Sequence, residues 1–248
     1  MTITFVTAFY APSSPSVYRS TEFYFSMFDH LASTELPIIV FLDETLHDQG
    51  ERLRGQYPNV TIEYTRLEKP WLPDAEFVLP LDRNEVKDTI DYFHVQLSKL
   101  RHLSQASQMV HTTHLAWIDF GIFHVMNDKD YAKQLLRQIY DIKLPLNTVF
   151  SPGCWDPRTK NEYFEHNEIE WYHCGGFMVG DSKRFGDLCE KQEALVKQHL
   201  PILTWEVNYW AMMLSDFVIY AADHDETMLS ELINCVPQLL LLNEKRLS

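Results

Sequence analysis

The chain has 248 residues, of which 46% are hydrophobic and 23% charged, a balance that allows one large α/β domain with a proper core. Its formal net charge of -14 and the lack of a Lys/Arg-rich run argue against a nucleic-acid partner, because phosphate neutralisation dominates that kind of affinity. No stretch approaches the roughly 18 apolar residues that a membrane helix needs, so no transmembrane segment is expected.

The cysteines and the first residues predict a cytoplasmic protein. Cys154, Cys174, Cys189 and Cys235 contain no Cys-x-x-Cys pair, and Met1 leads directly into a strand-like stretch without a basic start or a long apolar run. Reduced thiols are therefore expected. The apolar segment 237–242 leaves three alternatives open, namely core, homodimer contact, or peripheral contact with the inner face of a membrane, and core packing is favoured.

Apolar runs alternate with helical patterns along the chain, without repeats or flexible linkers, so residues 1–248 are expected to form a single domain. After the first strand comes a polar turn at 11–16, and an irregular, proline-punctuated stretch is expected at 68–80. Strands are expected at 2–8, 37–42, 60–64, 114–119, 148–150, 170–179 and 217–220. Helices are expected at 20–31, 46–56, 88–110, 129–140, 182–198 and 205–214, before an apolar region at 228–242. This order predicts an α/β fold with a mainly parallel central sheet flanked by helices.

Ligands of such sheets bind beyond the carboxyl ends of the strands, which makes residues 7–10, Asp43 and Asp119 candidates for a site. Asp119 is the sharpest of these, because it ends an apolar strand and a buried carboxylate is costly unless it binds a cation or accepts hydrogen bonds. The functional hypothesis is a divalent-metal ligand that holds a diphosphate. The structural alternative is an Asp that caps a turn or the next helix.

Two further segments invite a sugar-binding interpretation. Gly175 and Gly176 are expected inside a strand, where paired glycines mark a bulge or the close approach of a ligand or a neighbouring helix. Trp205 and Asn208 lie one helical turn apart and could stack on and hydrogen-bond to an acceptor sugar, although a Trp at helical spacing also suits a core. Asp181 is expected to cap the helix that follows it.

Three cationic or titratable side chains are candidates for phosphate or metal contacts. His224 follows a predicted strand and is a candidate late metal ligand or phosphate contact, with an acidic surface loop as the alternative. Lys99 and Arg19 could reach a phosphate, or could simply be solvated. The chain has no Walker loop, no Gly-x-Gly-x-x-Gly, no Gly-x-Ser-x-Gly elbow and no His-Glu-x-x-His, which weakens the cases for an NTPase, a dehydrogenase, a serine hydrolase and a zinc protease.

Three segments carry a family resemblance: Phe5-Val-Thr-Ala-Phe-Tyr10, Trp117-Ile-Asp-Phe-Gly121 and Trp171-Tyr-His-Cys-Gly-Gly-Phe177. In this order, over roughly residues 2 to 220, the chain resembles the HtrL/YibB (WlaTC/HtrL-type) glycosyltransferase family, which is similar to the broader GT-A class. The resemblance implies a GT-A-like, Rossmann-like domain and a role in the synthesis of surface polysaccharide or glycan.

The resemblance also implies roles for single residues. Asp119 matches the first Asp of the Asp-x-Asp motif of the class, whereas position 121 holds Gly in place of the second, so that Mn²⁺ or Mg²⁺ would be bound by Asp119 with His224 or water. The remaining implied positions are Thr7, Ala8 and Tyr10 for the base and ribose, Gly121, Gly175 and Gly176 for the donor, and Glu206 for an acid that contacts either sugar.

The predicted function is transfer of a sugar from a nucleoside diphosphate sugar to a saccharide acceptor, chiefly by positioning and by electrostatic stabilisation of the departing diphosphate. If the reaction inverts configuration, Glu206 could deprotonate the acceptor. Two alternatives remain open. One is a metal-dependent phosphohydrolase that uses Asp43 and Asp119, and the other is a non-catalytic binding or effector protein with a glycosyltransferase fold.

Overall fold

The structure is a computed structural model, which describes residues 2–11, 19–70, 76–160 and 163–247, with the side chains of 238–247 outside the description. The predicted turn at 11–16 and the apolar side chains of 238–242 therefore fall largely outside the described residues. Within this part of the chain, seven strands form one sheet in the order β3-β2-β1-β4-β6-β5-β7. The strands are β1 (Ile3–Phe9), β2 (Ile38–Asp43), β3 (Val60–Thr65), β4 (His114–Ile118), β5 (Val149–Gly153), β6 (Phe177–Asp181) and β7 (Val218–Ala221).

The sheet is parallel except at β6, which pairs antiparallel with both β4 and β5. β1 lies between β2 and β4 and is parallel to both. All seven residues of β1 are buried, as expected for a central strand covered on both faces. The predicted α/β class with a mainly parallel sheet flanked by helices is confirmed.

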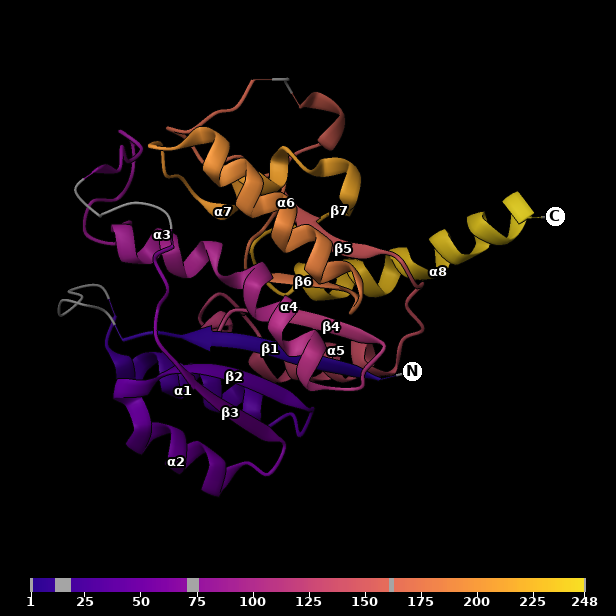
Figure 1. Ribbon diagram of the computed structural model, residues 1–248. Helices are drawn as coiled ribbons and strands as arrows, with labels where there is room; N and C mark the ends of the chain where they lie inside the picture. The colour runs from indigo at the N-terminus through magenta and orange to yellow at the C-terminus, as the bar shows by residue number, and fades with distance from the viewer. Residues whose placement is uncertain (1, 12–18, 71–75, 161–162, 248) are drawn as a thin grey trace.

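Helices cover both faces of the sheet (Figure 1). One layer contains α1 (Thr21–Ala32), α5 (Lys129–Asp141) and α8 (Thr227–Leu247), and α2 (His47–Gln56) adds Leu53 to the same core. The other contains α3 (Ile90–Leu97), α4 (Lys99–Met109), α6 (Arg184–His199) and α7 (Glu206–Ala211). Short 3₁₀ turns lie at η1 (Glu44–Leu46), η3 (Ile122–His124), η4 (Pro157–Thr159) and η5 (Leu214–Asp216).

Two predicted elements were wrong. The expected helix 88–110 is two helices, which meet at Ser98. The Ser98 hydroxyl donates to the Val95 carbonyl oxygen over 2.7 Å, a local bond by which Ser competes with the helical ladder. The expected strand 170–179 begins only at Phe177, so Gly175 and Gly176 lie in the turn before β6 and not inside a strand.

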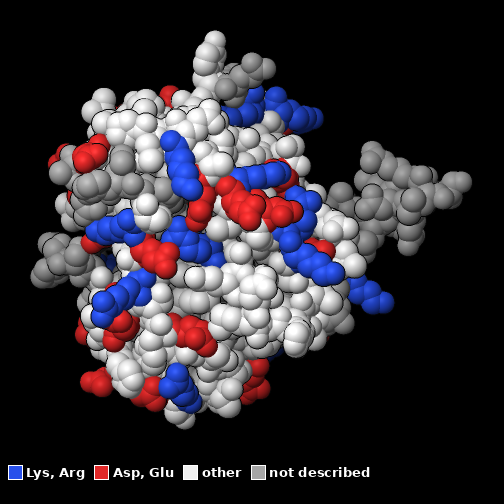
Figure 2. Space-filling model, in the orientation of Figure 1, with Lys and Arg blue, Asp and Glu red and all other residues white. Residues whose placement is uncertain are grey.

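The surface carries mixed charge. On the face shown in Figure 2, acidic and basic side chains are interspersed, and no continuous basic area is visible there. Among the described residues, none of the helices combines the length and the apolar character needed to cross a bilayer.

Candidate active site

A cavity of about 530 Å³ opens where β1 and β4 end side by side. The first strand contributes its last residues and the chain just beyond, and the second contributes Trp117 and the segment 119–121. The remaining lining residues are Arg19, Thr21, Tyr24, Leu67, Glu85, Val86, Lys87, Thr89, Asp91, Tyr92, Val95, Gln96, Lys99, His124 and His224. The volume falls within the range typical of small-molecule sites.

Asp119 lies on the cavity wall directly after β4, and its side chain is 36% exposed. Its backbone N–H donates to the Gly176 carbonyl oxygen over 2.9 Å, which fixes the start of the turn. Oδ1 accepts from Trp117 Nε1 at 2.7 Å and from Lys99 Nζ at 3.1 Å. With Oδ1 occupied by two donors, Oδ2 is the oxygen that remains for a ligand.

Lys99 is almost completely buried behind this carboxylate. Its ammonium group donates to Glu206 Oε1 at 2.8 Å and to the Gly175 carbonyl oxygen at 2.9 Å, in addition to the contact with Asp119. Burial lowers the pKa of Lys99, but the charges of Asp119 and Glu206 outweigh this and the pKa is raised, so the group stays charged. An ammonium has three protons, and each has a partner here.

Two sequence-based assignments change as a result. Lys99 lines the cavity, but its donors hold protein atoms, so the predicted phosphate contact is replaced by an internal ion-pair role. Glu206 is 4% exposed, binds Lys99 and does not line the cavity. Among the described residues Glu206 thus faces Lys99 and not the cavity, a position that does not favour the predicted role of general base.

His224 and Asp119 converge on Gly176. A Cβ added to Gly176 would lie 2.7 Å from Ile122 Cδ1, 3.3 Å from His224 Nε2 and 3.8 Å from Asp119 Oδ2, so the backbone is packed closely here. Gly175 and Gly176, which were predicted to bind the donor, do not line the cavity. Burial lowers the pKa of His224, which keeps the imidazole neutral at pH 7, the form that binds metal ions.

The residues present fit a divalent cation only in part. Among the described residues there is no group of three or more His, Cys, Asp or Glu side chains placed to hold a metal. One carboxylate oxygen and one neutral imidazole nitrogen match the set that Mn²⁺ accepts when phosphate oxygens supply the other ligands. Asp119 and His224 thus lie near the same glycine, and metal binding by this pair stays a prediction.

Arg19 reaches the cavity beside His124. Arg19 Nη1 donates to His124 Nε2 over 2.9 Å, and His124 Nδ1 donates to the Gly121 carbonyl oxygen over 2.6 Å, a tautomer that we assign from these partners. Burial lowers the pKa of His124, consistent with a neutral ring that accepts from Arg19. Gly121 lines the cavity, and a Cβ there would meet the Tyr24 ring at 2.6 Å.

The end of β1 is split between the site and the core. Ala8 and Tyr10 line the cavity as predicted, whereas Thr7 is fully buried, faces the other side of the sheet and does not line it. The Tyr10 hydroxyl lies 2.9 Å from His102 Nε2, and burial raises the pKa of Tyr10 to about 12. Tyr10 thus presents a fixed, neutral ring to the cavity.

The two residues predicted to bind the acceptor are structural. Trp205 is 5% exposed and packs edge-on against Phe93, with ring centroids 5.6 Å apart. Asn208 is completely buried, where its amide donates to the carbonyl oxygens of Glu165 and Glu168 and accepts from the Glu170 N–H. Neither lines the cavity, so the core alternative holds for both.

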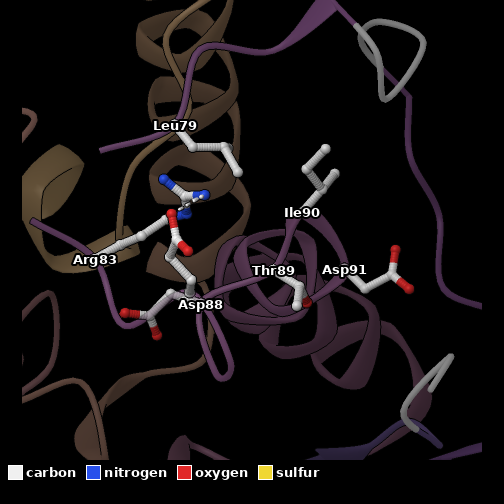
Figure 3. Close-up of a pocket in the computed structure, with 7 residues that line it drawn as sticks. Leu79, Arg83, Asp88, Thr89, Ile90 and Asp91 are labelled. Atoms are coloured by element: carbon white, nitrogen blue, oxygen red, sulfur yellow. Dashed lines mark ion pairs between the residues drawn. The ribbon is translucent and has the colours of Figure 1, made fainter. Parts of the chain in front are cut away.

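Sequence reasoning missed one wall of the cavity, formed by residues of the segment 85–96. This segment also borders a second, shallower pocket of about 340 Å³ (Figure 3). Glu85, Thr89 and Asp91 line both hollows, so the two are adjacent. Thr89 is a residue type that often caps helices, and its side chain does accept from the Tyr92 N–H at the start of α3. Nothing in the local sequence indicates that this helix start faces a cavity.

Comparisons with known proteins give distant matches in structure. No protein-family model and no curated protein sequence matches the chain. The 4-diphosphocytidyl-2C-methyl-D-erythritol synthase of Anaerococcus prevotii is 8% identical with a TM-score of 0.49, covering 96% of this chain and 98% of its own. The inositol-1-phosphate CTP transferase of T. maritima is 10% identical with a TM-score of 0.46, covering 91% of this chain and 86% of its own. The glycosyltransferase GlyE of Streptococcus pneumoniae is 9% identical with a TM-score of 0.45, covering 90% of this chain and 45% of its own.

With TM-scores below 0.5 and identities near 10%, these similarities do not assign an activity. The resemblance to the HtrL/YibB family is not confirmed by them and stays a prediction.

Proposed function

We propose that this chain transfers a sugar from a nucleoside diphosphate sugar to a saccharide acceptor, with the donor bound in the 530 Å³ cavity. The observation that carries the proposal is the state of Asp119. Its carboxylate is held at the cavity wall by Trp117 and Lys99 through one oxygen, while the other oxygen and His224 Nε2 both lie within 4 Å of the Cβ position of Gly176. Fixed charge at the carboxyl ends of parallel strands is where such folds bind phosphorylated ligands.

Asp119 Oδ2 and His224 Nε2 would hold Mn²⁺ or Mg²⁺ together with the donor diphosphate. When bound, the cation supplies positive charge to the leaving phosphates. Arg19, which lines the same cavity, would add a guanidinium on the phosphate side. Ala8 and Tyr10 would contact the nucleoside, and the sugar would lie beside Asp119 and Gly121, which line the same cavity.

The acceptor would enter over the shallow pocket of Figure 3, because this pocket shares Glu85, Thr89 and Asp91 with the donor cavity and so lies next to it. Its lining combines carboxylates, a hydroxyl and the Arg83 guanidinium, groups that accept from and donate to sugar hydroxyls. An Arg83→Met variant should raise KM for the acceptor several-fold and leave donor affinity unchanged.

The phosphohydrolase alternative loses its second carboxylate. Asp43 Oδ1 accepts from the N–H and the hydroxyl of Thr45 at the start of η1, and Asp43 does not line the cavity. Strand β1 also separates the ends of β2 and β4. Asp43 is therefore a capping residue, which makes it a suitable control position.

A ligand panel and one variant pair test the proposal. UDP, GDP, CMP and their sugars, each with and without Mn²⁺, are screened by thermal shift. A ligand present at 100 times its Kd should stabilise the chain by about 2.7 kcal/mol.

With a binding donor, Asp119→Asn should lower sugar transfer by about 10²–10³-fold, the loss typical of removing one electrostatic group, whereas Asp43→Asn should transfer at the wild-type rate. Wild-type transfer by Asp119→Asn would refute the assigned site, and binding without transfer to any acceptor would favour the effector alternative.

A further inference from the structure

Two cysteines lie in contact beside the candidate site. Cys154 Sγ and Cys174 Sγ are 3.3 Å apart, although twenty residues separate them in sequence. Cys154 follows the end of β5, and its N–H donates to the Trp171 carbonyl oxygen, while the Cys174 N–H donates to the Pro152 carbonyl oxygen. These two backbone bonds hold the segments side by side, so the thiols meet in a fixed arrangement.

The exposure of the two thiols differs. Cys154 is exposed and Cys174 is completely buried. An oxidant in solvent therefore reaches Cys154 first, and Cys174 stands behind it. In the part of the chain that the structure describes, the other cysteines have different neighbours: the Cys189 thiol lies 4.0 Å from Glu193 Oε1, and the Cys235 thiol donates to the Leu232 carbonyl oxygen.

We propose that Cys154 and Cys174 form a reversible disulfide when the chain meets a hydroperoxide. The Cys154 thiolate attacks the peroxide oxygen, breaks the O–O bond and becomes a sulfenic acid, and hydroxide leaves. The Cys174 sulfur then attacks Cys154 Sγ, its proton leaves with the displaced hydroxide as water, and the S–S bond closes. Each disulfide consumes one hydrogen peroxide, which is reduced to two waters.

The closing movement is small. The sulfur atoms must approach from 3.3 Å to about 2.05 Å. Burial, and then the neighbouring Cys154, raises the pKa of Cys174 far above the ordinary thiol value, so Cys174 is not the thiol that attacks the peroxide.

The position connects this modification to the site. Cys174 directly precedes Gly175, whose carbonyl oxygen accepts from Lys99, and Cys174 Sγ lies 3.9 Å from the Ala222 carbonyl oxygen, two residues before His224. A bridge at Cys174 would fasten the turn that carries Gly175 and Gly176 to the end of β5.

Thiol counting tests the proposal on the full chain. The reduced protein has four cysteines, and after equimolar hydrogen peroxide we expect two titratable thiols in denaturant, restored to four by dithiothreitol. Tryptic peptides 144–158 and 161–183 should appear linked, two hydrogens lighter than their sum, and a non-reducing gel should show a monomer.

Matched variants separate this pair from general oxidation. Cys154→Ser changes an exposed residue and should yield no linked peptide and no loss of its remaining thiols, whereas Cys189→Ser should still lose two. Four thiols persisting in the oxidised wild type, or a disulfide that involves Cys189 or Cys235, would overturn the proposal. These readouts require no substrate, so failure of the proposed transferase activity leaves them valid.

Discussion

At the scale of single residues, the group formed by Lys99, Asp119 and Glu206 determines the charge of the candidate site. Two carboxylates share one ammonium, which leaves one net negative charge next to the cavity. Buried charges are costly unless paired, and here the unbalanced charge falls on Asp119, the member with solvent access. The geometry thus favours a ligand that brings positive charge to Asp119, such as a cation bound with a diphosphate.

Lys99→Met should therefore destabilise the fold strongly. It leaves Glu206 buried without a counter-charge, and breaking a buried pair from one side costs about 3–5 kcal/mol. Urea unfolding measures this loss. Lys133→Met is the control, because Lys133 pairs with the exposed Asp130 and should change stability by less than about 1 kcal/mol. Equal stability of the two variants would show that the buried ion pairs contribute little.

His102 should make stability depend on acid. It is stacked on Phe41 inside the core, and burial lowers its pKa from 6.5 to about 4. As pH falls, the unfolded chain takes up the proton first. The stability contributed by the neutral ring is therefore complete above pH 6.5 and is lost between pH 6.5 and about 4. The loss over this window is on the order of 3 kcal/mol. Unfolding free energies of wild type and His102→Gln, measured from pH 7 to 4, should converge as pH falls, and parallel curves would contradict the assignment.

At the scale of elements, periodicity predicted most of the fold. Strands β1, β2 and β4 are continuous apolar runs, which only a covered sheet accommodates, and their predicted bounds lie within about two residues of those observed. The failures are local. Ser98 bonds back to a carbonyl oxygen and interrupts the predicted helix 88–110, although the apolar spacing on both sides is unchanged. The predicted strand 170–179 is a turn up to residue 176, because its backbone bonds to β5.

The sequence pointed to cavity-lining residues where they follow a strand. It did not show which residues the fold would bury away from the cavity. Asp119 was named because it ends an apolar strand, and His224 because it follows a predicted strand. Both line the cavity, although β6 and β5 lie between β4 and β7 in the sheet, and their roles stay predictions. Glu206, Trp205 and Asn208 form a polar-aromatic pattern that suits either a sugar site or a core, and only the fold shows that they face inward. A sequence does not display which side of a short helix its neighbours will cover.

Gly175→Ala should disturb the site through the turn before β6. An added methyl would collide with Glu206 Oε1 and press on Val207, so the Glu206–Lys99 pair must shift. Overpacking of this kind costs about 1–3 kcal/mol, measured by urea unfolding. Gly55→Ala, in α2, meets nothing within 4 Å and should be neutral or stabilising by up to about 1 kcal/mol. If Gly175→Ala matched this control, the packing of the turn against Glu206 would be looser than described.

At the scale of the whole molecule, the two helix layers share one sheet and can therefore unfold together. Each strand of the sheet centre sends alternate side chains into both cores: Phe5 and Phe9 of β1 face the α1 layer, while Val6 and Ala8 face the α4 layer. Neither layer can lose its packing without exposing one face of β1 and β4. This continuity predicts a single cooperative unit, and the expectation of one domain stays a prediction.

Leu31→Ala tests that coupling from the α1 side of the sheet, where the described core residues include no tryptophan. Leu31 of α1 is completely buried, whereas Trp117, Trp205 and Trp210 lie in the opposite core. The cavity should cost about 2–5 kcal/mol, and, if unfolding is cooperative, the tryptophan fluorescence midpoint should move as far as the circular-dichroism midpoint. Leu146→Ala, at a residue that is 63% exposed, should shift neither by more than about 0.5 kcal/mol. A fluorescence transition that stayed at its wild-type midpoint while the helical signal moved would show that the two layers unfold separately.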